Sequence, residues 1–303
     1  MALIDKIIGS IDRKNRLKEI KEKFIFSHIA PFVPEVEKDA KIYLANKFDS
    51  LTKFVEEELH RLKFVSPEDA EKKKELLEKT LIQELKNNGD LALLQKKLDD
   101  GKLITLGEVF LKNGLTTVVK DILENHERAG EIQNEWDENL GMLCVEYNHP
   151  ELAIVAMQQG TIYRMQQDSM GLTIGHRCVT HFAPNSKKCT NPEQYLEAIM
   201  VALSYQDSSF QQTKSGKTIG HLIAERLKAA PELVLCYEKA IGNEQTRYLE
   251  NISGKNMLDE GIANGYSAKA IQDKFGYSLA DYEERQYKKH LNIHIHGENE
   301  MGN

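Results

Sequence analysis

Proline is scarce in this chain, with 7 residues in 303, and stretches that alternate between apolar and polar residues are hard to find. A β-strand with one buried face shows such alternation, and proline interrupts helices. Apolar residues instead recur at helical spacing, as Ile4, Ile7, Ile8 and Ile11 do near the start of the chain. We therefore predict an all-α fold.

Long apolar runs are also missing, since no stretch approaches the roughly 18 consecutive residues of a membrane-spanning helix. Charges at Asp5, Lys6 and Asp12 interrupt the apolar core that a secretory signal peptide would need. Cysteine is too sparse for a disulfide framework, which favours reduced, buried thiols and a cytosolic protein. The four cysteines are Cys144, Cys178, Cys189 and Cys236.

An excess of positive charge is absent, because 40 Lys and Arg face 47 Asp and Glu and the net charge is −7. A general nucleic-acid binder needs the opposite balance, so we expect no nucleic-acid partner. Residues 1–25 are locally basic, which is typical of a helix on a membrane surface and also of a helix that packs on a neighbour. We favour packing, with peripheral membrane contact as the alternative.

Motifs of common catalytic sites do not occur: we find no GxSxG, HExxH, P-loop or GxGxxG pattern. His176 and Cys178 are two residues apart, so on a helix they point in different directions and cannot act as a nucleophile and its base. We therefore expect no catalytic residue and no cofactor. An enzyme with a catalytic N-terminal helical region in residues 1–75, and repeats for substrate capture, is the alternative.

His176, Cys178, His181 and Cys189 form the only cluster whose spacing would suit a tetrahedral zinc site. His176, however, has a counterpart in His221, where the surrounding cysteines are missing. A repeated position is better explained by structure than by a ligand set. We therefore expect no bound metal.

The sequence does contain an internal repeat, and it decides the expected fold. The twelve residues from Met165 (MQQDSMGLTIGH) and the twelve from Phe210 (FQQTKSGKTIGH) are identical at seven positions. A fainter third copy begins at Tyr248. Pro-Glu pairs also precede apolar helical stretches, since proline and glutamate both suit the first turn of a helix. These pairs begin at Pro150, Pro192 and Pro231.

A Gly-x-Thr-x-x-His opening to a short helix, followed by a second helix, resembles the ankyrin repeat. The matching positions, for which the resemblance implies a structural role in hydrogen bonding at the turn, are Gly171, Thr173, His176, Gly216, Thr218 and His221. The copies depart from the family at Ile-Gly, which stands where ankyrin repeats have Pro-Leu. Their spacings of 34, 45 and 38 residues between Asp137 and Gly254 also require insertions beyond the family period of about 33 residues.

The resemblance implies a helix–turn–helix solenoid of ankyrin type with an N-terminal helical cap. We expect an N-terminal helical region in residues 1–75, divergent repeats in 76–275 and a C-terminal helix with a polar tail in 276–303. The first unit is expected near Thr80 and Gly89.

Ankyrin-type arrays serve as protein-interaction scaffolds, which bind partners through exposed turns and a concave face. Divergent arrays in a Lys- and Asn-rich chain are similar to effectors of intracellular bacteria, which would place the partner, a host protein, in the host cytosol. We expect the partner-binding residues on successive turns, where aromatic and Arg side chains supply most interface energy. They are Tyr163, Arg164, Gln166, Gln167, Phe210, Gln211, Gln212, Lys214, Arg247 and Tyr248.

Overall fold

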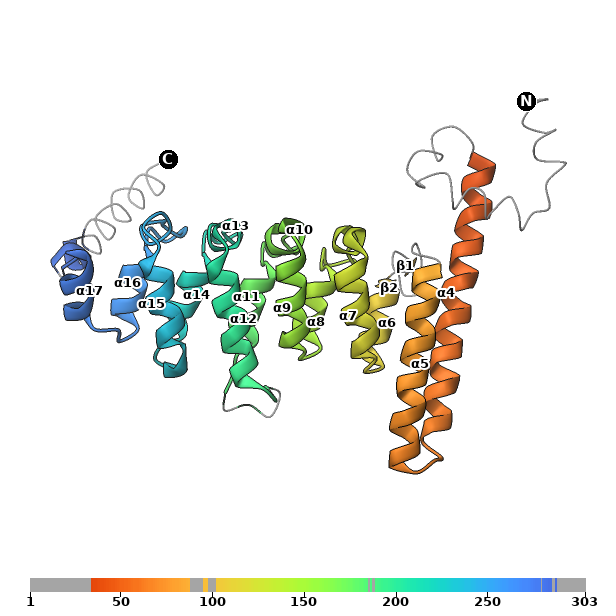
Figure 1. Cartoon of the computed structure of the whole chain (residues 1–303). Coiled ribbons are helices and arrows are strands. Elements are labelled where there is room, and N and C mark those ends of the chain that lie inside the picture. The colour runs from red at the N-terminus through yellow and green to blue at the C-terminus, as the bar shows by residue number, and fades with distance from the viewer. Residues whose placement is uncertain are drawn as a thin grey trace, which may run out of the picture. The chain divides into compact units, whose positions relative to one another are not determined.

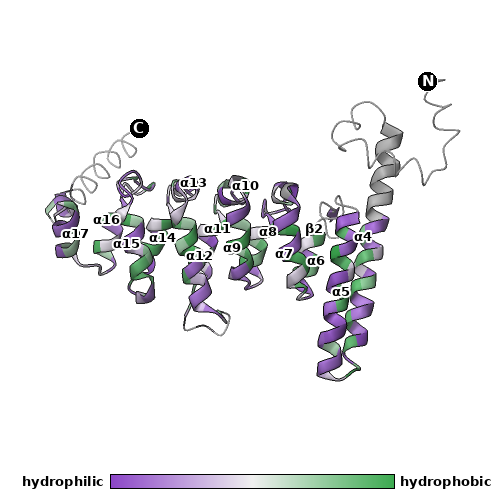
Figure 2. Cartoon of the chain, in the orientation of Figure 1, coloured by the Kyte–Doolittle hydropathy of each residue, from purple (hydrophilic) through white to green (hydrophobic). Residues whose placement is uncertain are grey.

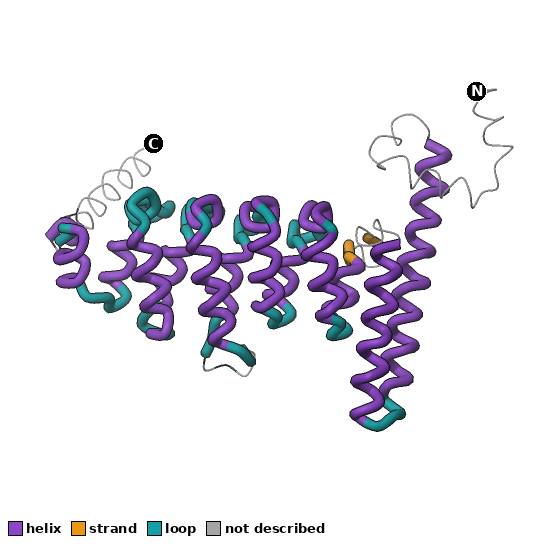
Figure 3. Tube along the Cα trace, in the orientation of Figure 1, coloured by secondary structure: helices purple, strands orange, loops and turns teal. Residues whose placement is uncertain are grey.

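A computed structural model of the chain describes residues 34–87, 95–97, 102–184, 186, 189–278, 280–284 and 287. The described residues are predominantly helical, which confirms the all-α prediction, and their only strands form one short hairpin (Figures 1 and 3). Contacts within the chain divide it into two compact units, residues 1–135 and 136–303, which are described separately.

The first unit begins with two long antiparallel helices, α4 (Pro34–Leu62) and α5 (Pro67–Asn87). Ser66 caps α5, because its Oγ accepts the Asp69 N–H at 3.2 Å. Buried apolar residues of the two helices include Phe48, Val55, Leu77, Leu81 and Leu85. The domain boundary expected at residue 75 falls within α5. Thr80, near which we expected the first repeat, is also a residue of this long helix.

A short antiparallel hairpin, β1 (Gln95–Lys97) and β2 (Leu103–Thr105), leads into the helix pair α6 (Leu106–Lys112) and α7 (Thr116–Asn125). A 3-10 turn, η2 (Glu127–Glu131), follows. Thr105 caps α6 by accepting the Glu108 N–H at 3.1 Å. This pair resembles the helix pairs that follow in its helix lengths and in its N-cap.

The second unit contains four further helix pairs (Figure 1). The first helices of these pairs contact one another in chain order, and the second helices α9, α12 and α15 do the same. Short helices α10 (Thr161–Met165) and α13 (Gln206–Ser209) follow α9 and α12. The pairs are α8 (Leu140–Glu146) with α9 (Pro150–Gln159), α11 (Ile174–His181) with α12 (Pro192–Ser204), α14 (Ile219–Arg226) with η3 (Pro231–Leu233) and α15 (Val234–Gly242), and α16 (Met257–Ala263) with α17 (Ala268–Phe275).

The breaks between paired helices follow the sequence signals. Pro150, Pro192 and Pro231 each begin the second helical segment of a pair. Asn148 ends α8 in the left-handed region, with φ +62°, and the His149 N–H bonds the Cys144 carbonyl at 2.7 Å. This bond across the last turn is the Schellman motif, which satisfies carbonyls that the helix itself leaves free.

Glycine near the start of the first helices permits their close packing. A Cβ added at Gly175 would lie 2.5 Å from Ile219 Cδ1 and 2.7 Å from Ala202 Cβ. One helix pair earlier, a Cβ added at Gly141 would likewise lie 2.5 Å from Ile174 Cδ1. The Ile-Gly pair, which departs from the ankyrin pattern, is therefore explained: the isoleucine of one unit fills the space left by the glycine of the preceding unit. Hydrophobic residues accordingly appear on both helices of the pairs (Figure 2).

We predict that Gly175→Ala destabilises the protein by about 1–3 kcal/mol, because the added methyl group overlaps Ile219 and Ala202 in a packed core. Gly242→Ala is the matched control, since a Cβ there meets no atom within 4 Å. Urea unfolding of both variants measures the difference. Equal stability of the two variants would show that the helix pairs are not this closely packed.

Candidate functional site

The segments that precede the first helices share one hydrogen-bonding pattern. Asp168 N–H donates to the Leu172 carbonyl, and Thr213 N–H donates to that of Lys217, both at 2.9 Å. The residue near the tip has a positive φ, +80° at Gly171. Glycine is required there for two reasons: the left-handed conformation, and a backbone nitrogen of Lys214 that would lie 2.7 Å from an added Cβ.

Successive turns are also joined backbone to backbone. Ser169 N–H donates to the Trp136 carbonyl at 2.9 Å, Lys214 N–H to Met170 at 3.3 Å, and Ile252 N–H to Ser215 at 3.1 Å. The four turns therefore form one continuous surface. We call it the turn row and define it as residues 136–139, 168–173, 213–218 and 251–256.

The repeated Thr residues end two of these turns, the repeated His residues lie in the helices that follow, and all four are fully buried. His176 Nδ1 accepts the Thr173 N–H at 3.2 Å, and the Thr173 hydroxyl accepts the His176 backbone N–H, so the pair forms a reciprocal helix cap. His176 Nε2 lies 3.2 Å from the Lys217 carbonyl of the next unit, to which it donates as the neutral tautomer. Thr218 and His221 repeat the arrangement.

Burial keeps these histidines neutral. It lowers the pKa of His176 from 6.5 to about 4 and also lowers the pKa of His221. With Nδ1 accepting and Nε2 donating, neither ring nitrogen of His176 is free for proton transfer to a ligand. The geometry gives these residues a structural role.

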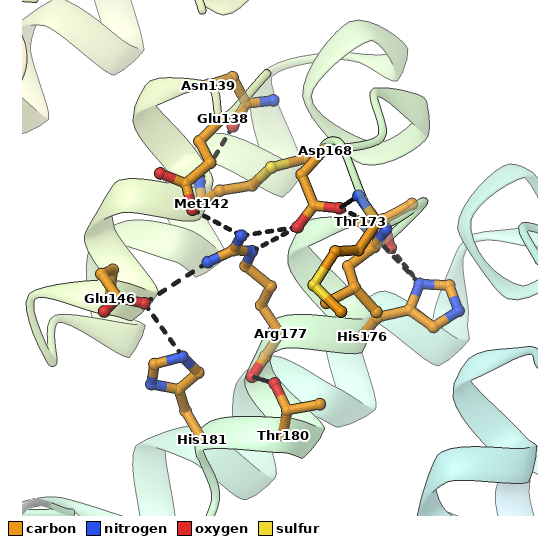
Figure 4. Close-up of polar contacts among 12 residues, drawn as sticks. Glu138, Asn139, Met142, Glu146, Asp168, Thr173, His176, Arg177, Thr180 and His181 are labelled. Atoms are coloured by element: carbon orange, nitrogen blue, oxygen red, sulfur yellow. Dashed lines mark hydrogen bonds and ion pairs between the residues drawn. The ribbon is translucent and has the colours of Figure 1, made fainter. Parts of the chain in front are cut away.

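A charged cluster centred on Arg177 lies beside the second turn (Figure 4). Its guanidinium bonds Asp168 Oδ2 through Nε at 3.0 Å and Nη2 at 2.6 Å, and Nη2 also contacts Glu138 Oε1 at 2.5 Å. Glu146 Oε2 lies 3.4 Å from Nη1 and 3.2 Å from His181 Nε2. The guanidinium of Arg177 is thus paired with carboxylates from two successive helix pairs. These ion pairs connect the two helix pairs, and they leave Arg177 unavailable to bind an anion.

The cysteines and histidines considered for zinc are engaged separately. Cys178 is fully buried in α11, where burial raises its thiol pKa to about 12. His176 belongs to the helix cap, and His181 pairs with Glu146. In the described part of the chain, no three His, Cys, Asp or Glu side chains are grouped so that they could hold a metal ion.

Four of the ten residues predicted to contact a partner make side-chain contacts between neighbouring units: Arg164, Gln166, Gln167 and Gln212. Tyr163 is only 2% exposed, so its side chain lies in the core. Arg164 forms an ion pair with Asp207 at 2.8 Å, and its guanidinium lies 4.0 Å from the centre of the Tyr205 ring. The segments 161–165 and 206–209 pack against each other as α10 and α13, which sequence spacing alone did not indicate.

The predicted glutamines also make internal hydrogen bonds. Gln166 accepts from Asn139, Gln167 donates to the Gln212 carbonyl, and Gln212 donates to the carbonyls of Gly216 and Glu250. Gln211 bonds the Asp207 carbonyl within its own segment, and Phe210 is half-buried. The glutamines shared by the two copies therefore have a structural explanation.

In the fourth segment, Arg247 is buried, with its guanidinium 4.5 Å from the centre of the Phe275 ring, whereas Tyr248 is exposed. Of the ten predicted contact residues, Lys214 and Tyr248 are the exposed ones. Sequence reasoning missed other exposed side chains of the turns and of the segments entering them, which are large and apolar. They are Trp136, Ile162, Met165, Met170 and Ile252. For Trp136, Met170 and Ile252, the signal was an apolar residue one or two positions before the left-handed residue of the turn.

Several other predictions concern the chain ends. Residues 1–25, considered for membrane contact, lie outside the described residues. The same holds for most of the predicted C-terminal region 276–303, including every residue after 287. The described part of the region 1–75 belongs to α4 and α5. Across the described ranges, no helix has the length and apolar character needed to cross a membrane.

Compared with known proteins, the chain matches no protein-family model and no curated protein sequence.

We predict that Arg177→Met costs about 3–5 kcal/mol, because it leaves the buried carboxylates of Asp168 and Glu138 without their cation. Arg128→Met is the control: Arg128 is half exposed and lies 3.7 Å from Glu131, so its loss should cost no more than about 0.5 kcal/mol. Urea unfolding measures both. A loss at Arg177 as small as that at Arg128 would show that the cluster is solvated and adds little stability.

We also predict that His176→Ala costs about 1–3 kcal/mol at pH 7, since it removes the partner of buried groups. The unfolded chain binds a proton at His176 below pH 6.5, whereas the folded protein does not until about pH 4. The wild type therefore loses stability as the pH falls through this window, by up to about 3 kcal/mol from this residue.

The gap between wild type and His176→Ala should consequently narrow from pH 7 to pH 4 in thermal melts. His221→Ala should behave in the same direction, because burial lowers the pKa of His221 as well. A gap that does not change with pH would mean that His176 titrates as in the unfolded chain. A fully stable variant would contradict its structural role.

Proposed function

We propose that the helix pairs between Leu106 and Phe275 are divergent ankyrin-type repeats and that the protein binds another protein through them. The support is the order of parts in the last four helix pairs: a turn with a left-handed residue, a short capped helix, a break and a second helix. The Thr–His caps of α11 and α14 and the hydrogen bonds between successive turns add to it.

A repeat array suits a binding role because each unit contacts only its neighbours, which leaves a long continuous edge. Most of the exposed large apolar side chains described in the second unit lie on the turn row and on the segments that enter it, whereas Val234, Leu235 and Tyr287 lie elsewhere. Such residues on a surface are typical of interaction sites. This concentration is the observation that carries the proposal, and its members are Trp136, Ile162, Met165, Met170, Tyr248 and Ile252.

Nothing among the described residues favours the enzymatic alternative. The groups that enzymes commonly use are here buried and bonded: His176 in a helix cap, Cys178 as a neutral thiol and Arg177 between carboxylates. Their contacts are all explained by the stability of the array.

A host protein is the first partner class to test, because the divergent repeats resemble those of effectors from intracellular bacteria. We predict that the full chain captures a partner from a cultured animal-cell lysate. The double variant Met165→Ser, Tyr248→Ser should retain its melting temperature but bind the same partner at least about tenfold more weakly, a change of about 1.4 kcal/mol.

The matched control is Val234→Ser, Leu235→Ser, which removes two exposed apolar side chains from α15, away from the turn row. It should bind like the wild type. Retained binding by the first variant, with loss in the control, would place the partner on the second helices. Absence of any captured protein that responds to either variant would count against the scaffold role.

A further inference from the structure

The tips of the turn row present a fixed order of side chains. Backbone hydrogen bonds place Met170 beside Lys214 and Ile252 beside Ser215, while Trp136 accepts from the turn of Ser169. Trp136 is 57% exposed, Met170 65% and Ile252 79%. Lys214, between Met170 and Ile252, is also exposed. The order along the row is therefore apolar, apolar, cationic, apolar.

Lys214 differs from the other lysines of the turn row. Lys217 pairs with Glu225 at 2.7 Å, and Lys255 lies 3.7 Å from Glu260. Lys214 has no such ion pair with any residue that the structure describes. Its ammonium group can therefore accept an acidic group from outside without first breaking an internal ion pair.

We infer that the turn row binds a polypeptide segment that carries an acidic side chain between apolar side chains. The inference deepens the proposed protein-binding function and rests on it. The carboxylate pairs with Lys214, and the apolar side chains contact Met170 on one side and Ile252 on the other, with Trp136 extending the contact. An exposed ion pair alone contributes little, so the apolar contacts supply affinity and Lys214 supplies orientation and selectivity.

A phage-displayed library of random 16-residue peptides, selected on the full chain, tests the inference. The enriched peptides should contain an acidic residue flanked by apolar residues. In fluorescence anisotropy, a synthetic copy of the most enriched peptide should bind Lys214→Glu at least tenfold more weakly. Exchange of its acidic residue for lysine should restore binding to that variant, because the charges are swapped.

Two matched controls locate the contact. Lys239→Glu reverses an exposed lysine on α15, and Leu235→Ser removes an exposed leucine from the same helix. Both should bind the peptide like the wild type, whereas Met170→Ser and Ile252→Ser should weaken it severalfold. Melting curves of all variants should coincide with that of the wild type.

Enrichment of basic or uncharged peptides, enrichment of none, or binding that Lys214→Glu leaves unchanged would overturn the inference. If those peptides still respond to Met165→Ser, Tyr248→Ser, the protein-binding function of this edge stands and only the ligand chemistry is wrong. If neither the peptides nor the lysate partner respond to that double variant, the proposed function fails as well.

Discussion

The carbonyl of Lys217 receives two hydrogen bonds, one from the Thr213 N–H of its own turn and one from His176 of the preceding unit. The carbonyl of Lys255 has the same two kinds of partner, Asn251 and His221. Because a carbonyl oxygen has two lone pairs, this arrangement uses both of them. It also fixes the distance between successive units. The packing of isoleucine over glycine and the alignment of the turns both depend on that distance.

The last described pair, α16 with α17, has a different cap. Asn256 and Asp259 form the reciprocal cap there in place of Thr and His. A histidine would need a following turn to accept its second N–H, but an aspartate can instead accept the hydroxyl of Tyr277, which comes from the segment after α17. Asn and Asp at the Thr and His positions made the third copy faint in the sequence. They are consistent with a cap that has no further turn of the row beside it.

The all-α fold, the Pro-Glu helix starts and the Thr–His positions could be predicted because each depends on local chemistry that sequence displays. The start of the helix pairs could not be predicted, because the helical pattern around Thr80 is equally compatible with the long helix α5. The internal contacts of the predicted partner-binding residues could not be predicted for a related reason. Arg164 and Gln167 look like surface residues, yet their partners Asp207 and Gln212 come from the next unit, more than 40 residues away in the sequence. The Gln-Gln pairs that the two copies share take part in such bonds. The exposed positions, such as Met170 and Lys214, lie at the turn tips, where the two copies differ.

Side chains at the turn tips can change without disturbing the alignment of the units. Main-chain atoms hold the turns together at Met170, Lys214 and Ile252, so the side chains of these residues are not needed for the alignment of the units. Their substitution should alter the surface at little cost to folding, as is usual for exposed positions. Arg164 is the opposite case, because a glutamate there would face Asp207 across a partly buried contact and lose the stacking on Tyr205. Recognition can therefore diverge at the turn tips, while Arg164, Gln167 and His176 are constrained by the array itself.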